Sequence, residues 1–254
     1  MRLITIPMSH YCEKARWGLT HAGVDYVEEA HLQVMHYWAV RRYSRQGMVP
    51  VLVDGTTAIA DSTAILQYLD HQLPNNQKLY PAQLQHEVES FEERFDEQLG
   101  VATRRWVYFH WMGLPAKVVL KTAGQGTPLW QRSLAPLLMP LLRRFLNRKL
   151  GITRVNVDAD RQTILAIFDD VATRLSDGRP YLCGSQFTAA DLTFACMAAP
   201  ILLPPEYGIR LPSLEEAPAH AVPDIEQLRA HPAGQFALRL FRRRTQSAAR
   251  SRQT

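Results

Sequence analysis

The sequence predicts two regions of different fold class, a mixed α/β region over residues 1–75 and an all-helical region over residues 82–245. In the first region, short apolar runs typical of strands alternate with helical patterns. A polar linker punctuated by Pro74 and Pro81 follows, and apolar residues then recur at helical spacing. With 254 residues, the chain is long enough for about one to two domains. Residues 246–254 are expected to form a disordered basic tail.

Composition places the chain among ordinary soluble globular proteins, because 46% of its residues are hydrophobic and 21% are charged. Its 3 cysteines are an odd number and scattered, which argues for a reducing compartment and a cytoplasmic location. No apolar run approaches the roughly 20 residues that span a bilayer, so we expect no membrane partner. The net charge of +5 is concentrated near the C-terminus, so we expect no nucleic-acid partner either. The cations concerned are Arg239, Arg242, Arg243, Arg244, Arg250 and Arg252.

The first predicted strand, residues 3–6, leads directly into a helix. Pro7 cannot continue the strand, and from Cys12 apolar residues recur at helical spacing until Gly23. Ser9 and Cys12 have the spacing of a thioredoxin redox motif with serine in the leading position, where it cannot form a disulfide. Because the first amides of a helix lack intrahelical partners, an anion is favoured at this turn. Read alone, the pair also fits an N-cap serine followed by a buried cysteine.

Three further strand-like runs follow in the first region. Residues 24–31 alternate between polar and apolar side chains, as a half-buried strand does. Val49–Pro50 enters a third strand, and Asp54–Gly55 is a hairpin signal before a fourth run at residues 57–60.

Two helices complete the first region. Residues 36–45 form a short basic helix. Asp61–Ser62 opens another that runs to about Gln72, and either side chain is a good N-cap.

Taken together, three motifs resemble the glutathione-binding domain of cytosolic glutathione transferases. Ser9-x-x-Cys12 follows the first strand, Val49–Pro50 enters the third, and Asp61–Ser62 caps the third helix, in the family's order and at about its spacing. The resemblance implies a thioredoxin-like N-terminal domain followed by a helical-bundle C-terminal domain. It also implies a homodimer that binds glutathione and a small electrophile, with a role in detoxification.

The resemblance assigns roles to individual residues. Ser9 would be the catalytic residue, hydrogen-bonding the glutathione thiolate with help from the helix-start amides near Tyr11 and Cys12. Pro50 would be cis, which costs little before proline, and the Val49 backbone would pair with the cysteinyl part of glutathione. The Ser62 hydroxyl and helix amides would hold the γ-glutamyl carboxylate, and Asp61 would face its ammonium.

A cation for the glycine carboxylate of glutathione is expected from the basic helix, but the sequence does not choose among several candidates. Met48 stands where many relatives carry lysine or glutamine, which puts one familiar contact in doubt. The candidates are His36, Arg41, Arg42, Arg45 and Gln46.

In the helical region, Val88, Phe91, Phe95 and Leu99 form a core-facing stripe. The aromatic and basic segment 104–111 follows. In the family its counterpart walls the pocket for the electrophile, and an aromatic lining suits an apolar substrate. The tentative pocket residues are His10, Arg105, Tyr108 and Trp111.

Residues 113–150 contain seven glycines and prolines among apolar clusters, so we expect short or kinked helices and a class-specific lid or rim. A clear helix follows at residues 158–175. Thr188 and Asp191 have capping-box spacing ahead of a buried run. The histidines form no cluster with metal-ligand spacing, so no metal site is expected.

Two other functions remain open at this stage. Cys12 could be the working thiol of a glutathione-dependent disulfide reductase or peroxidase, because a helix start lowers the pKa of a thiol. Alternatively, the fold could serve a non-enzymatic binding protein.

Overall fold

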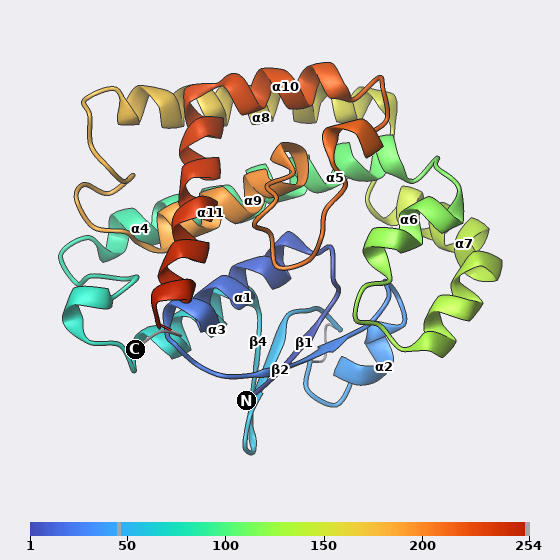
Figure 1. The fold of residues 1–254 in the computed structure, drawn as a ribbon, viewed down its shortest axis with the longest axis horizontal. Helices are drawn as coiled ribbons and strands as arrows, with labels where there is room; N and C mark the ends of the chain where they lie inside the picture. The colour runs from blue at the N-terminus through green and yellow to red at the C-terminus, as the bar shows by residue number, and fades with distance from the viewer. Residues whose placement is uncertain (45–46, 252–254) are drawn as a thin grey trace.

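The computed structural model describes residues 1–44 and 47–251. A small sheet with its own helices forms the N-terminal domain, and a larger helical layer packs against it (Figure 1). The N-terminal domain is thioredoxin-like and the C-terminal domain is all-helical, as the sequence predicts.

Four strands form a mixed sheet in the order β2-β1-β3-β4. They are β1 (Arg2–Thr5), β2 (Val27–Ala30), β3 (Val51–Asp54) and β4 (Thr57–Ala60). β1 runs parallel to β2 and antiparallel to β3, with Ile4 paired to Val51. β3 and β4 form the expected hairpin, and Gly55 supplies the positive φ of +56° in its turn.

Helices cover both faces of the sheet. On one face, α1 (His10–His21) and α3 (Ser62–Asp70) pack their apolar residues against β1 and β3. On the other face lies α2 (His36–Val40), whose Val40 contacts Ile4 and Val51. α2 ends at Val40, earlier than the expected residue 45. This arrangement brings the start of α1 and the start of α3 to the end of the sheet at which β3 begins.

The C-terminal domain is built around α9 (Ala189–Leu202), which is buried along nearly its whole length. Its start carries the predicted capping box, in which the Thr188 amide donates to Asp191 Oδ2 at 2.8 Å. Around it lie α4 (Gln85–Arg94), a π-helical turn (Phe95–Leu99), α5 (Gly100–Trp111), α8 (Arg154–Leu175), α10 (Val222–Ala230) and α11 (Pro232–Ser251). Short 3-10 turns occur at Asn75–Gln77 and Leu214–Glu216. α11 therefore enters the segment 246–254 that the sequence assigned to a tail.

Two helices, α6 (Ala116–Ala123) and α7 (Leu129–Lys149), project from the right-hand side of the molecule beside α2 (Figure 1). The sequence predicts short or kinked helices here; α6 has 8 residues, whereas α7 is a single element of 21 residues with Pro136 and Pro140 inside it. Both prolines are exposed. Water can therefore hydrogen-bond the carbonyl groups that their missing N–H groups leave free.

No helix among residues 1–44 and 47–251 is long and apolar enough to cross a membrane.

Candidate glutathione site

Ser9 is the N-cap of α1. Its Oγ accepts a hydrogen bond from the Cys12 amide at 3.3 Å, and its own amide donates to the Ile6 carbonyl at 3.0 Å. The cap therefore uses the hydroxyl oxygen only as an acceptor. The Ser9 hydroxyl also hydrogen-bonds the Cys12 thiol, and because a hydroxyl hydrogen rotates freely, an anion bound at the helix start could take over this hydrogen.

Val49 and Pro50 lie directly before β3, and the peptide bond between them is cis. The register that pairs Ile4 with Val51 places Val49 opposite Ile6 when it is continued by two residues. Because the Ile6 carbonyl accepts a hydrogen bond from the Ser9 amide, the cis-proline turn and the start of α1 lie at the same end of the sheet.

Asp61 is the N-cap of α3 and lies beside the same turn. Its amide donates to the Pro50 carbonyl at 3.2 Å, and its Oδ1 accepts from the amides of Thr63 (2.8 Å) and Ala64 (3.1 Å). Asp61 has φ +90°, a conformation that costs about 1–3 kcal/mol for a residue with a side chain and that is found mainly at functional sites. Ser62, the first residue of α3, is almost fully buried. The structure therefore brings all three predicted motifs together.

The Cys12 side chain lies beneath α1 rather than in the site. It is 0% exposed, and its Sγ accepts from the Ile6 amide at 3.5 Å. Burial raises the pKa of the thiol, although Arg16 and the Ser9 hydrogen bond oppose this effect. The environment therefore favours an inert thiol over a reactive thiolate.

Arg104 and the aromatic side chains around it form a cluster next to the start of α1. The Arg104 guanidinium lies 5.9 Å from the centre of the Tyr11 ring, and the rings of His10 and Tyr11 are 4.4 Å apart. Burial, followed by the charge of Arg104, lowers the pKa of His10 to about 3, so this imidazole is neutral at pH 7. Tyr108, one turn after Arg104, is half-buried, and desolvation raises the pKa of its phenol.

Tyr11 is held against the second domain by its hydroxyl, which donates to the Asp96 carbonyl at 2.7 Å. Burial raises its pKa to about 12, so it stays protonated. Gly100 allows this approach, because a Cβ there would lie 2.7 Å from Tyr11 Oη.

The structure places Arg105 and Trp111 in other contacts. Arg105 donates to the Leu150 carbonyl at 3.0 Å and to both carboxylate oxygens of Asp160, which joins α5 to α8. Trp111 is buried in the helical core, 5.8 Å from the ring of Trp106. Sequence reasoning singled out Arg105 and passed over Arg104. The i, i+4 spacing of Arg104 and Tyr108 was the signal that places them on one face of α5.

Three of the candidate residues for binding the glycine carboxylate of glutathione lie among the described residues. His36 is buried, its Nε2 lies 3.1 Å from the Gly47 carbonyl oxygen, and burial lowers its pKa to about 4, so it carries no charge at pH 7. Arg41 and Arg42 are exposed, and Arg42 stacks 4.7 Å from the Tyr43 ring. Arg45 and Gln46 lie outside the described residues.

Sequence reasoning missed a buried ionic cluster behind the site. Lys14 is fully buried on α1, and its Nζ lies 2.8 Å from Glu92 Oε1 and 2.6 Å from Asp96 Oδ2. Thr63, next to Ser62, receives a hydrogen bond from Lys14 at 2.8 Å. Desolvation raises the pKa of Asp96 although Lys14 opposes it. The cluster therefore joins the starts of α1 and α3 to the second domain.

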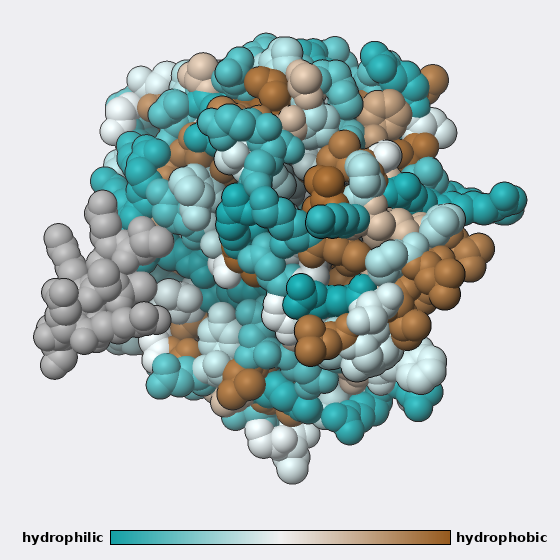
Figure 2. Space-filling model, turned by 45° about the vertical axis from the view of Figure 1, so that its right-hand side comes forward, coloured by the Kyte–Doolittle hydropathy of each residue, from teal (hydrophilic) through white to brown (hydrophobic). Residues whose placement is uncertain are grey.

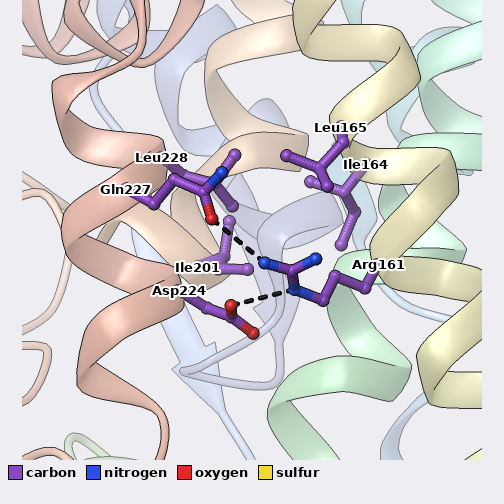
Figure 3. A pocket seen from close by; sticks show the side chains of 7 residues that line it. All are labelled: Arg161, Ile164, Leu165, Ile201, Asp224, Gln227 and Leu228. Carbon is purple, nitrogen blue, oxygen red and sulfur yellow. Dashed lines mark hydrogen bonds and ion pairs between the residues drawn. The ribbon is translucent and has the colours of Figure 1, made fainter.

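A hollow of about 570 Å³ lies near the loop between β1 and α1, lined by Gln125 and by residues 203–205 and 207–213. Its wall includes Tyr207, whose hydroxyl donates to the Met8 carbonyl at 3.3 Å, one residue before Ser9. A smaller gap lies between α8 and α10 (Figure 3). There Arg161 is bonded to Asp224 at 2.9 Å and to Gln227 at 3.0 Å among apolar side chains, which links α8 to α10.

Among the described residues, no group of three or more histidine, cysteine or acidic side chains could hold a metal ion.

Fold and site together define a thioredoxin-like domain with a serine-capped first helix, joined to a helical bundle. A family model of the glutathione S-transferase N-terminal domain matches residues 3–77, and one of the C-terminal domain matches residues 154–232. The chain belongs to the glutathione transferase superfamily and has its glutathione-binding fold. A comparison with curated proteins finds no match.

Solved structures with a similar fold cover almost the whole chain. A glutathione S-transferase of Ceriporiopsis subvermispora in complex with glutathione is 16% identical, covers 96% of each chain and has a TM-score of 0.64. A glutathione S-transferase of Rhodospirillum rubrum F11 is 21% identical, with 93% of this chain and 91% of that chain covered and a TM-score of 0.56. The beta-etherase LigF of Sphingobium sp. strain SYK-6 is 18% identical, with 94% and 98% covered and a TM-score of 0.57.

Proposed function

We propose that this protein is a glutathione transferase that joins the sulfur of glutathione to an electrophilic carbon of a small, apolar substrate. The glutathione thiol releases its proton to solvent, and the thiolate forms the new carbon–sulfur bond while the leaving group departs with its bonding electrons. The observation that supports this proposal is the position of the Ser9 hydroxyl at the start of α1, where its hydrogen could rotate from the Cys12 thiol to the sulfur of glutathione. In this role Ser9 is the catalytic residue.

The energy required is within reach of this arrangement. Lowering a thiol pKa of about 8.5 by two units needs about 2.7 kcal/mol of preferential thiolate stabilisation. A hydrogen bond to a charged group contributes about 1.5–3 kcal/mol, and the helix start adds about 0.3–1 kcal/mol. Holding the thiolate next to the electrophile supplies much of the remaining acceleration.

Glutathione would lie at the end of the sheet where the three motifs meet. Val49 would pair its backbone with the cysteinyl part, next to the cis peptide bond with Pro50. The γ-glutamyl group would meet Ser62 and the exposed carboxylate of Asp61 at the start of α3. Arg41 or Arg42 would then serve the glycine carboxylate, because His36 is neutral.

The electrophile would meet the wall formed by Tyr11, His10 and Tyr108, and the hollow near the loop between β1 and α1 offers room for it. The hollow has a mixed lining, with apolar side chains such as Leu203 and Ile209 beside Gln125 and Arg210. Two copies of the chain would form a dimer in the cytoplasm, as the family resemblance implies.

Substitution of Ser9 tests the proposal. With an aryl halide as substrate, Ser9→Ala should lower kcat/KM about 25-fold at pH 7, because the ionised fraction of the thiol falls from about three quarters to about 3% when its pKa rises from about 6.5 to about 8.5. Ser9→Thr is the matched control, because it keeps both the hydroxyl and the cap and should retain most of the activity. Both variants are also assayed with a mixed disulfide of glutathione.

The outcomes separate three functions. Loss of conjugation in Ser9→Ala alone supports the transferase. Disulfide reduction that persists in Ser9→Ala would assign the chemistry to Cys12 instead. Absence of either activity in the unmodified protein, with glutathione still bound, would leave a binding protein.

A further inference from the structure

α7 has two faces of different character. Its inner face is buried against the molecule through Gln131, Ala135, Met139 and Leu146. Gln131 fixes it by accepting from the Leu32 amide at 2.9 Å and by a 2.8 Å contact with His31 Nδ1. One side of α7 is therefore packed against the rest of the molecule.

The outer face of α7 is apolar and open to solvent. Leu137 is 76% exposed and Leu141 is 70% exposed. At 100° per residue, six exposed large apolar side chains of α7 fall within an arc of about 100° that runs along the helix for about 15 residues, or roughly 22 Å, whereas Leu129, 74% exposed, lies outside it. We call this surface the α7 outer face, and its members are Trp130, Leu134, Leu137, Leu138, Leu141 and Phe145.

Figure 2 shows hydrophobic surface gathered on the right-hand side of the molecule, where Figure 1 places α6 and α7. Most of the large exposed hydrophobic side chains of the described chain belong to α7. A concentration of this kind marks an interaction site rather than scattered surface residues.

The charge of this region has a single sign. Between Glu97 and Asp158 the sequence has no aspartate or glutamate, so α6 and α7 carry cations alone. Arg144 and Arg148 are exposed and border the α7 outer face: by the same helical spacing, Arg144 lies along its side and Arg148 lies beyond Phe145 at its C-terminal end. The charged residues of the two helices are Lys117, Lys121, Arg132, Arg143, Arg144, Arg148 and Lys149.

We propose that the α7 outer face binds the surface of an anionic lipid bilayer, with Trp130, Phe145 and the leucines inserted at the headgroup boundary. A helix with Trp, Phe and Leu on one face and only Lys and Arg as its charges has the composition of an interfacial membrane helix. Arg144 and Arg148 reach anionic headgroups from the border of that face. This mode needs no spanning segment, so it revises the expectation that the chain has no membrane partner.

The charge also argues against a second copy of this chain as the binding partner of the α7 outer face. Pairing two such faces would bring two all-cationic helices together without any acidic residue to compensate them. An anionic surface neutralises the same charges. The continuous aliphatic stripe in turn distinguishes a bilayer from a nucleic acid, which binds cations through its phosphates.

Sedimentation of the full-length protein with lipid vesicles tests the proposal. We expect binding to vesicles of phosphatidylcholine with 30–40% phosphatidylserine (about a third, a composition chosen for its strong negative surface potential) and little binding to phosphatidylcholine alone. Leu137→Ser/Leu141→Ser should weaken the partition coefficient at least about tenfold. Arg144→Gln/Arg148→Gln should weaken it about 25-fold, from about fivefold per cation. Trp130 fluorescence should shift to shorter wavelength on binding, and Trp130→Phe should remove that shift.

Val27→Ser is the matched control, because Val27 is 70% exposed on β2, away from α7, and its replacement should leave binding unchanged. Circular dichroism confirms that each variant is folded. Absence of binding to anionic vesicles overturns the proposal, and so does equal binding to neutral vesicles. Dissociation of a dimer by Leu137→Ser/Leu141→Ser without vesicle binding would overturn it in favour of a second copy.

Discussion

Ser9 and Cys12 are three residues apart on one helix, yet the fold gives their side chains opposite environments. The Ser9 hydroxyl stands at the open start of α1, whereas the Cys12 thiol is sealed against β1 by the Ile6 amide. A helix start lowers a thiol pKa only where the sulfur is accessible to the free amides and to water. Burial therefore outweighs the helix start at Cys12.

Replacement of Cys12 should accordingly spare activity and reduce stability. We expect Cys12→Ala to change kcat/KM for conjugation less than about threefold while lowering the free energy of unfolding by about 1–2 kcal/mol, through loss of buried contacts. Enzyme kinetics and urea denaturation measure the two effects. Cys196→Ala, at another fully buried thiol, is the control and should behave alike. A large loss of conjugation confined to Cys12→Ala would contradict the assignment of Cys12 to packing.

At the scale of elements, caps place the working groups. Ser9 caps α1, Asp61 caps α3 and Thr188 caps α9, the central helix of the second domain. The α9 cap is also linked to the preceding loop, because Asp191 Oδ1 accepts from the Leu182 amide at 2.8 Å. Burial raises the pKa of Asp191 to about 6, against the hydrogen bonds that it accepts.

Stability should depend on pH through Asp191. An acid whose folded-state pKa lies above its unfolded value of about 3.9 holds its proton more tightly when folded, so its contribution to stability is greatest at low pH and is lost as the pH rises to about 6. Over this interval we expect the unmodified protein to lose on the order of 2–3 kcal/mol relative to Asp191→Asn. Urea denaturation at a series of pH values measures the difference. Parallel pH profiles for the two proteins would contradict a raised pKa.

How much of the site the sequence predicts differs from element to element. The four strand-like runs, the three motifs and the capping box of α9 follow local rules of strand, turn and cap chemistry, and the structure contains each of them. The length of α7 was not predicted, because its prolines are usual helix breakers and only their exposure makes them tolerable. The sequence did not indicate that Lys14 is buried in an ionic cluster, because lysine is usually exposed and the partners of Lys14 lie about 80 residues away in the chain.

At the scale of the whole molecule, the ionic cluster of Lys14, Glu92 and Asp96 connects the two domains at the site. A second set of contacts acts on the opposite side of α1, where Glu13 pairs with Arg16 at 3.1 Å and with Arg244 of α11. The last helix is thus tied to the first, although the sequence suggested a solvated basic end. Both sets hold α1, and with it Ser9, against the second domain.

Removal of the Lys14 charge should destabilise the protein strongly. Lys14→Met leaves two buried carboxylates without a cation, which typically costs about 3–5 kcal/mol. Urea denaturation at pH 7 measures it, and Lys14→Met/Glu92→Gln/Asp96→Asn should recover much of the loss. The exposed pair of Arg154 and Asp158 is the control, and Arg154→Met should cost less than about 1 kcal/mol. Equal effects of the two single substitutions would contradict the role given to the buried cluster.

The most direct test of the proposed chemistry is a pH titration of the thiol of bound glutathione, followed by the ultraviolet absorbance of its thiolate. In the unmodified protein we expect a pKa about two units below the value of about 8.5 for a free thiol, and in Ser9→Ala a value close to that of the free thiol. Ser9→Thr should resemble the unmodified protein. The same pKa for bound glutathione in the unmodified protein and in Ser9→Ala would contradict the assignment of the hydroxyl as the group that holds the sulfur anion.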